Sequence, residues 1–291
     1  MVQAPQQHYY FGMGPRGFHR LSYLEWGNAH NSDVLICVHG LTRNAHDFDF
    51  LASVLCQDYR VICPDLVGRG NSDYVGDLSA YTFNQYIADM VALIARLGVK
   101  EVTFLGTSIG GIIGMMLASF PKTLIKRLIL NDVGMIVPHL AMSRLATYAR
   151  NDLGFQNLEQ AKKYFKLIMP DSRILLESQW DHIVQWGTRQ DVDGIYKLAY
   201  DPTIGEAFLS LSVSDMHLET FWYDLNCPLL VLHGEESDFL TPEIISKMSI
   251  IQPDMDIMEI PDAGHAPALM SDLEISVIQE WLKMPKFSNK R

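Results

Sequence analysis

The sequence predicts an α/β protein with a mostly parallel, doubly wound sheet of eight strands and a helical segment inserted after the sixth strand. Three observations support this prediction. Short apolar runs alternate with segments of helical spacing along most of the 291 residues. A glycine-rich turn at residues 106–111 joins one apolar run directly to a helix. Between residues 135 and 223 the apolar runs stop, and aromatic residues at mostly helical spacing take their place.

The predicted strands are of two kinds. Residues 8–11 and 18–26 alternate between polar and apolar side chains and are joined around glycines, which is typical of an antiparallel pair. The other six are short, mostly apolar runs, as expected of parallel strands that helices cover on both faces. These six lie at residues 34–38, 59–63, 102–105, 125–130, 228–234 and 255–260.

Helices are expected between these strands. The segment 81–97 places Tyr86, Met90 and Ile94 on one face, which is the spacing of an amphipathic helix. Pro242 after Thr241 is typical of a helix start. The remaining predicted helices of the core lie at residues 47–55, 112–118 and 272–282.

The turn Gly106-Thr107-Ser108-Ile109-Gly110-Gly111 is the most informative motif. A serine at the tip of a sharp strand-to-helix turn has a strained backbone, and side chains on either side of it would clash, so Gly106 and Gly110 fit such a turn. The serine hydroxyl is then exposed at the sheet edge, where the helix N-terminus favours negative charge. Two other glycine-rich motifs do not fit, because Ser108 stands where a dinucleotide-binding turn has glycine and no P-loop lysine follows.

Composition excludes several classes of protein. The net charge of −11 argues against nucleic acid as a partner and against an anionic membrane surface. No apolar run reaches the ~18 residues of a membrane span. Residues 1–7 are polar and resemble no signal peptide, which favours a cytoplasmic location. The four cysteines are not closely paired, and no His/Glu spacing of a zinc hydrolase is present, so we expect neither a metal nor another cofactor.

A serine nucleophile needs a base, and His265 is the best candidate among the ten histidines. It lies in a glycine-flanked loop after the last predicted strand, and a parallel sheet brings that loop to the same edge as Ser108. His39 also follows a strand, but it stands beside Gly40 in a loop expected to supply a backbone donor. His233 lies within a strand and is expected to be structural.

The acid that orients the base has two candidates. Asp238 follows the strand at 228–234, and Asp132 follows the strand at 125–130. We favour Asp238, because Gly234 and the residues after it give that loop room to turn inward. The order Ser108, Asp238, His265 is that of the α/β-hydrolases. Asp132 remains the alternative, because it also ends a strand.

Together these segments resemble the α/β-hydrolase fold with a helical cap, over residues 9–282. The resemblance implies a core of residues 1–134 and 224–291 and a cap of residues 135–223. It also implies that Ser108 is the nucleophile of a nucleophile elbow, His265 the base and Asp238 the acid, with the backbone N–H groups of Leu41 and Ile109 as the oxyanion hole. The segments that carry the resemblance are 39–41, 64–72, 106–111, 131–134, 234–238 and 264–265.

This sequence differs from several well-known groups of α/β-hydrolases at the motif residues, which reduces the number of reactions it is expected to catalyse. Haloalkane dehalogenases and epoxide hydrolases have aspartate in place of Ser108, dienelactone hydrolases have cysteine, and the His-Gly-Gly-Gly run of lipases is missing. The resemblance therefore favours a serine esterase that acts on small esters through an acyl-enzyme, as a monomer or homodimer. An acidic chain with an apolar cap offers little to attract anions, so we expect uncharged, apolar substrates. Carbon–carbon bond hydrolases, lactonases, thioesterases, cofactor-free haloperoxidases and slow-turnover ligand receptors remain alternatives.

Overall fold

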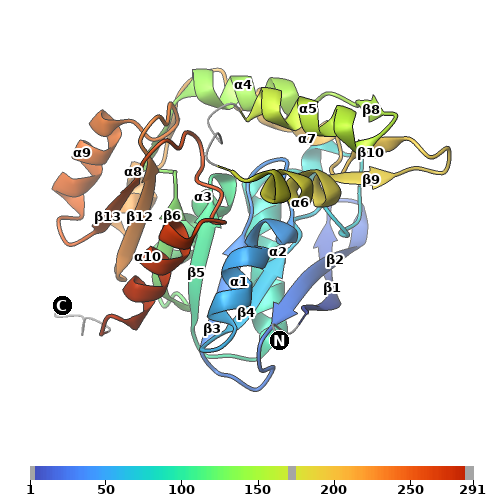
Figure 1. The fold of residues 1–291 in the computed structure, drawn as a ribbon. Coiled ribbons are helices and arrows are strands. Elements are labelled where there is room, and N and C mark those ends of the chain that lie inside the picture. The colour runs from blue at the N-terminus through green and yellow to red at the C-terminus, as the bar shows by residue number, and fades with distance from the viewer. Residues whose placement is uncertain (1–3, 170–174, 286–291) are drawn as a thin grey trace.

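The computed structural model describes residues 4–169 and 175–285. An eight-stranded sheet forms its centre, with the strand order β1-β2-β4-β3-β5-β6-β12-β13 (Figure 1). The first two strands are antiparallel, and β2 also runs antiparallel to β4, whereas the other pairs are parallel. The predicted fold class is confirmed. The strands are β1 (Gln6–Gly14), β2 (Gly17–Trp26), β3 (Val34–Val38), β4 (Arg60–Pro64), β5 (Val102–Thr107), β6 (Ile125–Asn131), β12 (Leu229–Gly234) and β13 (Asp256–Ile260).

Helices cover both faces of the sheet because successive strand residues point to opposite sides. In β3, Leu35 and Cys37 join one buried cluster, and Val34 and Ile36 join the other. The first cluster includes residues of α1 (Asp49–Leu55) and α10 (Asp272–Lys283). The second includes residues of α2 (Phe83–Leu97), α3 (Ile109–Ser119), α8 (Glu219–Tyr223) and α9 (Pro242–Ile251). Short 3-10 turns η1 (Ala45–Phe48) and η2 (Leu78–Ala80) precede α1 and α2.

Helix α2 shows how local sequence sets an element boundary. The predicted start at Tyr81 moves to Phe83 because the Thr82 side chain accepts a hydrogen bond from the Gln85 N–H and caps the helix there. The helix ends at Gly98, whose φ of 66° is a left-handed conformation that favours glycine.

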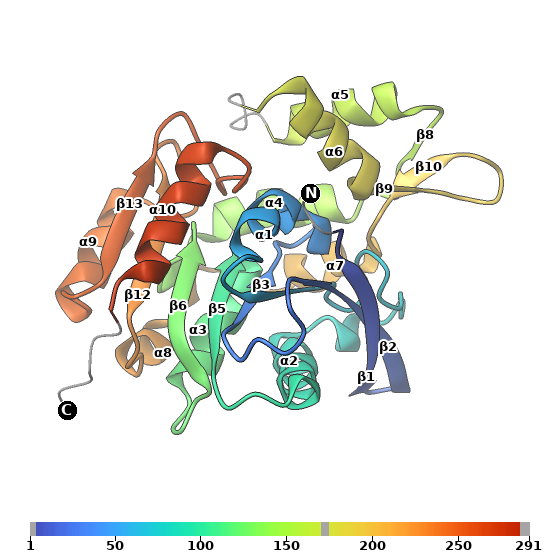
Figure 2. The same cartoon turned by 60° about the horizontal axis from the view of Figure 1, so that its bottom comes forward.

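Most of the inserted segment (residues 135–223) lies across the carboxyl-terminal edge of the sheet, whereas its last helix, α8, packs against α3 (Figure 1). It contains the predicted helices, and α5 packs beside α6 at the end farthest from α9 (Figure 2). It also contains strands of two or three residues, which are too short to give a sequence pattern and were not predicted. The elements are β7 (Ile136–Val137), α4 (His139–Ala149), β8 (Gly154–Phe155), α5 (Leu158–Ile168), α6 (Glu177–Gly187), β9 (Thr188–Gln190), β10 (Tyr196–Leu198), α7 (Thr203–Leu209) and β11 (Met216–His217).

No helix in residues 4–169 and 175–285 combines the length and the apolar composition that a bilayer crossing requires.

Candidate active site

Ser108 occupies the turn between β5 and α3, with φ 53° and ψ −115°. The close approach of neighbouring backbone requires the flanking glycines. A Cβ on Gly106 would lie 2.3 Å from backbone atoms of Gly110, and a Cβ on Gly110 would lie 2.2 Å from the carbonyl oxygen of Val38. The turn therefore holds the serine in a strained conformation that the surrounding backbone imposes.

His265 lies in the loop after β13, as the sequence predicts, and its ring reaches Ser108. The distance from Nε2 to the serine Oγ is 2.9 Å. The ring of Phe239 stacks on the imidazole with centroids 4.0 Å apart. The imidazole is thus fixed between an apolar ring and the serine hydroxyl.

Asp132, not Asp238, holds the other nitrogen of His265. Asp132 Oδ2 lies 2.7 Å from His265 Nδ1. Because a carboxylate only accepts hydrogen bonds, Nδ1 must donate, which leaves Nε2 as the acceptor facing Ser108. The side chains of both residues are almost completely buried. The structure therefore brings together Ser108, His265 and Asp132 in one chain of hydrogen bonds.

The expected position of Asp238 is wrong. Its carboxylate is half exposed and accepts two hydrogen bonds from Arg144 Nη2 on α4, both 2.8 Å long. The loop after β12 does turn inward, but it does so to support Asp132: Gly234 N–H and Ser237 Oγ donate to the Asp132 carboxylate at 3.0 and 2.6 Å. The inward turn of the loop therefore brings Ser237 to the Asp132 carboxylate, a supporting role that the sequence did not predict.

Strand order explains why Asp132 is better placed. Strand β6 lies directly beside β5, and Asp132 follows the end of β6 with φ 56°, so its side chain starts next to the elbow. The β12 loop begins one strand farther from Ser108. Aspartate adopts the left-handed backbone conformation more readily than most residues, which suits it to this position. The backbone angle is visible only in the structure, so the sequence did not distinguish Asp132 from Asp238 on this ground.

His39 has a structural role at the turn that follows β3. Burial lowers its pKa to about 3, so the ring is neutral. Nδ1 donates to the Gly40 carbonyl oxygen at 2.8 Å, and Nε2 accepts from the Leu66 N–H at 3.1 Å. These bonds fix the peptide that precedes Leu41.

The expected oxyanion donors, Leu41 and Ile109, belong to two fixed turns. Ile109 is the first residue of α3, directly after Ser108. The Leu41 carbonyl oxygen accepts a 2.9 Å bond from Nε of the fully buried Arg69, whose Nη1 also binds Tyr86. The peptide on either side of Leu41 is thus held by a buried side chain, while the donor role of both N–H groups stays a prediction.

A pocket above Ser108 is formed jointly by the core and the inserted segment. Its walls are mostly apolar, with contributions from Phe48, Phe165 and Ile183. Two guanidinium groups, Arg43 and Arg144, also line it. These charges were not predicted, because Arg43 stands in a core loop and Arg144 in the cap, where the sequence gives no sign of which way they face.

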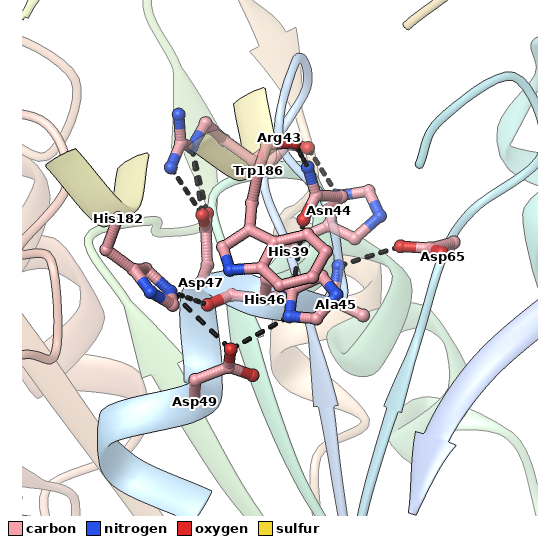
Figure 3. Close-up of polar contacts among 11 residues, drawn as sticks. His39, Arg43, Asn44, Ala45, His46, Asp47, Asp49, Asp65, His182 and Trp186 are labelled. Atoms are coloured by element: carbon pink, nitrogen blue, oxygen red, sulfur yellow. Dashed lines mark hydrogen bonds and ion pairs between the residues drawn. The ribbon is translucent and has the colours of Figure 1, made fainter. Parts of the chain in front are cut away.

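The inserted segment is attached to the core loop 44–49 by polar side chains and stacked rings, a contact that we call the seam (Figure 3). Asn44 Nδ2 donates to the Trp186 carbonyl oxygen at 2.8 Å, and His182 Nε2 donates to the His46 carbonyl oxygen at 2.9 Å. The rings of His46 and Trp186 stack with centroids 3.4 Å apart. Asp49 completes the seam by accepting from His46 Nδ1 at 2.8 Å.

Within the described part of the chain, no group of three or more His, Cys, Asp and Glu side chains is arranged to hold a metal ion.

Known proteins with similar sequences or structures share this arrangement of the chain. The alpha/beta hydrolase family pattern matches residues 35–274. A 3-hydroxybutyrate-oligomer hydrolase of Cupriavidus necator is 36% identical over 97% of this chain and 99% of its own. A 2-(acetamidomethylene)succinate hydrolase of Mesorhizobium japonicum is 26% identical over 80% of this chain and 81% of its own.

The crystal structure of an alpha/beta hydrolase from Novosphingobium aromaticivorans superposes with a TM-score of 0.86, at 30% identity, over 97% of this chain and 99% of that one. Its match extends over the core and the inserted segment together. From the family pattern and the full-length relatives, this chain is an enzyme that belongs to the alpha/beta hydrolase family.

Proposed function

We propose that this protein is a serine hydrolase that cleaves esters of small hydroxy acids through an acyl-enzyme on Ser108. The observation that carries the proposal is the hydrogen-bonded chain from Ser108 Oγ through His265 to Asp132, with bonds of 2.9 and 2.7 Å. Such a chain is what a serine hydroxyl needs in order to become a nucleophile near neutral pH.

Acylation uses each member of the chain. His265 Nε2 takes the Ser108 proton while Oγ attacks the ester carbonyl, and Asp132 stabilises the imidazolium that forms. In this proposal the N–H groups of Leu41 and Ile109 donate to the oxyanion, and such donors typically contribute a few kcal/mol each. The imidazolium then returns its proton to the departing alkoxide, so that an alcohol leaves and the acyl group stays on Ser108.

Deacylation repeats the sequence with water. His265 takes a proton from a water molecule while the water oxygen attacks the acyl carbon. It then gives that proton to Ser108 Oγ when the bond between Oγ and the acyl carbon breaks. The products are a carboxylic acid and the free enzyme. No step needs a cofactor.

The substrate class follows from the relatives and from the pocket. The Cupriavidus necator relative is named for oligomers of 3-hydroxybutyrate, which are joined by ester bonds and end in a free carboxylate. The Mesorhizobium japonicum relative is named for a succinate, which also carries carboxylates. Because the largely buried guanidinium of Arg43 lines the pocket, we replace the expected uncharged ester with a small ester that carries a carboxylate.

The test is hydrolysis of the dimer 3-hydroxybutyryl-3-hydroxybutyrate, with release of 3-hydroxybutyrate measured by chromatography. We expect turnover by the wild-type protein and a loss of about 10⁴-fold or more in kcat in Ser108→Ala, which removes the nucleophile. A fluorophosphonate label located by mass spectrometry should modify Ser108. Turnover that survives Ser108→Ala would contradict the serine mechanism, and a wild-type protein inactive on this dimer but active on p-nitrophenyl esters would contradict the substrate class.

A further inference from the structure

Arg43 is a charged side chain beside the nucleophile in a mostly apolar pocket. It follows the turn that contains Leu41, and it lines the pocket together with Phe48 and Phe165. Only 15% of its side chain is exposed. Burial of a guanidinium group costs free energy, and apolar residues of similar size usually replace a buried ion pair without loss of stability. Stability alone therefore does not account for an arginine here.

The hydrogen bonds of Arg43 leave one nitrogen unused. Nε lies 3.0 Å from both carboxylate oxygens of Asp47, and Nη2 lies 2.5 Å from Oδ1 (Figure 3). Nη1 is buried and has no hydrogen-bond partner among residues 4–169 and 175–285. A buried donor without a partner costs about 1–3 kcal/mol, a cost that an acceptor on a ligand would remove. Asp47 thus fixes the plane of the guanidinium and leaves Nη1 without an acceptor among the described residues.

The distance to Ser108 is short. A Cβ placed on Gly40 would lie 3.9 Å from Arg43 Cγ and 3.9 Å from Ser108 Cβ, so these two atoms are at most twice that distance apart. In an ester of a 3-hydroxy acid, only two carbon atoms separate the ester oxygen from the free carboxyl carbon. A carboxylate that belongs to the leaving group must therefore lie close to the serine, in the pocket that Ser108 and Arg43 both line.

We propose that Arg43 binds the free carboxylate of the departing hydroxy acid through Nη1, and that it thereby selects esters whose alcohol part is itself a carboxylic acid. The inference rests on the proposed function and adds the residue that sets its specificity. A planar guanidinium donates to carboxylate oxygens with fixed geometry, whereas an ammonium group does not. Asp47 keeps the pair close to neutral, so selection depends on a directed hydrogen bond rather than on net charge.

Arg144 offers a matched comparison. It lines the same pocket and is also paired with a carboxylate, but its side chain is 33% exposed and that of Asp238 is 54% exposed. Exposed ion pairs contribute little, because water screens them and competes for the same hydrogen bonds. Arg144 should therefore attract anions weakly and not discriminate between substrates.

The experiment compares kcat and KM for 3-hydroxybutyryl-3-hydroxybutyrate and for its methyl ester, which lacks the terminal charge. We expect the wild-type protein to prefer the acid. Arg43→Gln should lower kcat/KM for the acid by about 10- to 100-fold, the effect of one charge-assisted hydrogen bond, and change kcat/KM for the methyl ester by less than about threefold. Arg43→Lys should recover only part of the loss, and Arg144→Gln should leave the ratio of the two substrates within about threefold of wild type.

Each other outcome decides against the inference. Equal losses on both esters in Arg43→Gln would show a structural role. Wild-type turnover of both esters without discrimination would overturn this inference alone, and turnover of neither would overturn the proposed function with it. Product inhibition of the wild-type enzyme gives a test that needs no variant: free 3-hydroxybutyrate should inhibit more strongly than its methyl ester, and the reverse order would contradict carboxylate binding.

Discussion

The triad region and the seam are built in opposite ways. The triad side chains come from the ends of β5, β6 and β13, three strands of one sheet, and each is buried and held by backbone that packs around it. The seam is a contact between side chains of the loop 44–49 and of α6, with a half-buried ring stack and two hydrogen bonds to carbonyl oxygens.

The difference indicates which part of the molecule can open. Strand ends in a central sheet separate only when the sheet itself unfolds, whereas a small contact between two surface elements opens at a lower free energy. We therefore expect the reacting groups to stay fixed while α6 moves to admit substrate. The predictions that follow separate these two behaviours, from the largest expected effect to the smallest.

The largest effect should come from the acid that binds His265. Asp132→Asn should lower kcat by about 10⁴-fold, because the amide fixes the wrong tautomer and cannot stabilise the imidazolium. Asp238→Asn, the matched control at the residue that sequence favoured, should change kcat by less than about threefold. Steady-state kinetics of both variants, with melting temperatures measured in parallel, decide the assignment. A larger loss of kcat in Asp238→Asn than in Asp132→Asn would contradict the assignment of Asp132 as the acid.

Weakening the seam should affect the entry of substrate into the pocket and not the rate of the chemical steps. Trp186→Ala removes the ring that stacks on His46 and should raise KM by about 3- to 10-fold, with kcat changed less than twofold, because ordering the pocket then costs more free energy. Hydrogen exchange should become faster in α6 and stay unchanged in β5 and β6. Trp281→Phe, on the far helix α10, is the control. Faster exchange that extends into β5 would show that the two regions unfold as one unit.

The smallest effect concerns pH and the neutral ring of His39. Its pKa is lowered to about 3 by burial, so between that value and the ordinary value of ~6.5 the unfolded chain binds a proton that the folded chain does not. The free energy of unfolding should therefore fall as pH decreases through this window. His39→Gln should reduce the slope by up to about 1.4 kcal/mol per pH unit, and His30→Gln, at an exposed ring, should not. Urea unfolding at a series of pH values measures both slopes, and equal slopes in wild type and His39→Gln would contradict the neutral assignment.

The sequence predicted the fold well because its information is local. An alternating pair and six apolar runs locate all eight strands of the sheet, and the elbow places Ser108 at a strand end. His265 was placed beside it because parallel strands bring their carboxyl ends to one edge. The choice between Asp132 and Asp238 depended on which strand lies beside β5 in the sheet. The order of strands in the sheet differs from their order along the chain, so the sequence did not reveal it.

The pocket and the seam could not be predicted for a related reason. Asn44 and Trp186 are 142 residues apart, and their contact depends on how the inserted segment lies on the core. Arg43 and Asp47 have the spacing of an ion pair, yet nothing in the sequence indicates that the pair lies inside the pocket. The expectation of an uncharged substrate came from the acidic net charge of the whole chain and from the apolar residues of the inserted segment, which say little about the charge of one pocket.

The loop after β3 has a consequence for protein engineering. Within a stretch of nine residues it holds the expected oxyanion donor Leu41, the guanidinium of Arg43, and the seam residues Asn44, His46 and Asp49. In a chimera that exchanges only the inserted segment, the new segment would pack on a loop 44–49 whose side chains match a different helix. That mismatch would lie next to the groups that perform the reaction. Segments 41–49 and 135–223 form one unit of exchange, and new substrate ranges should be sought by transplanting the two together.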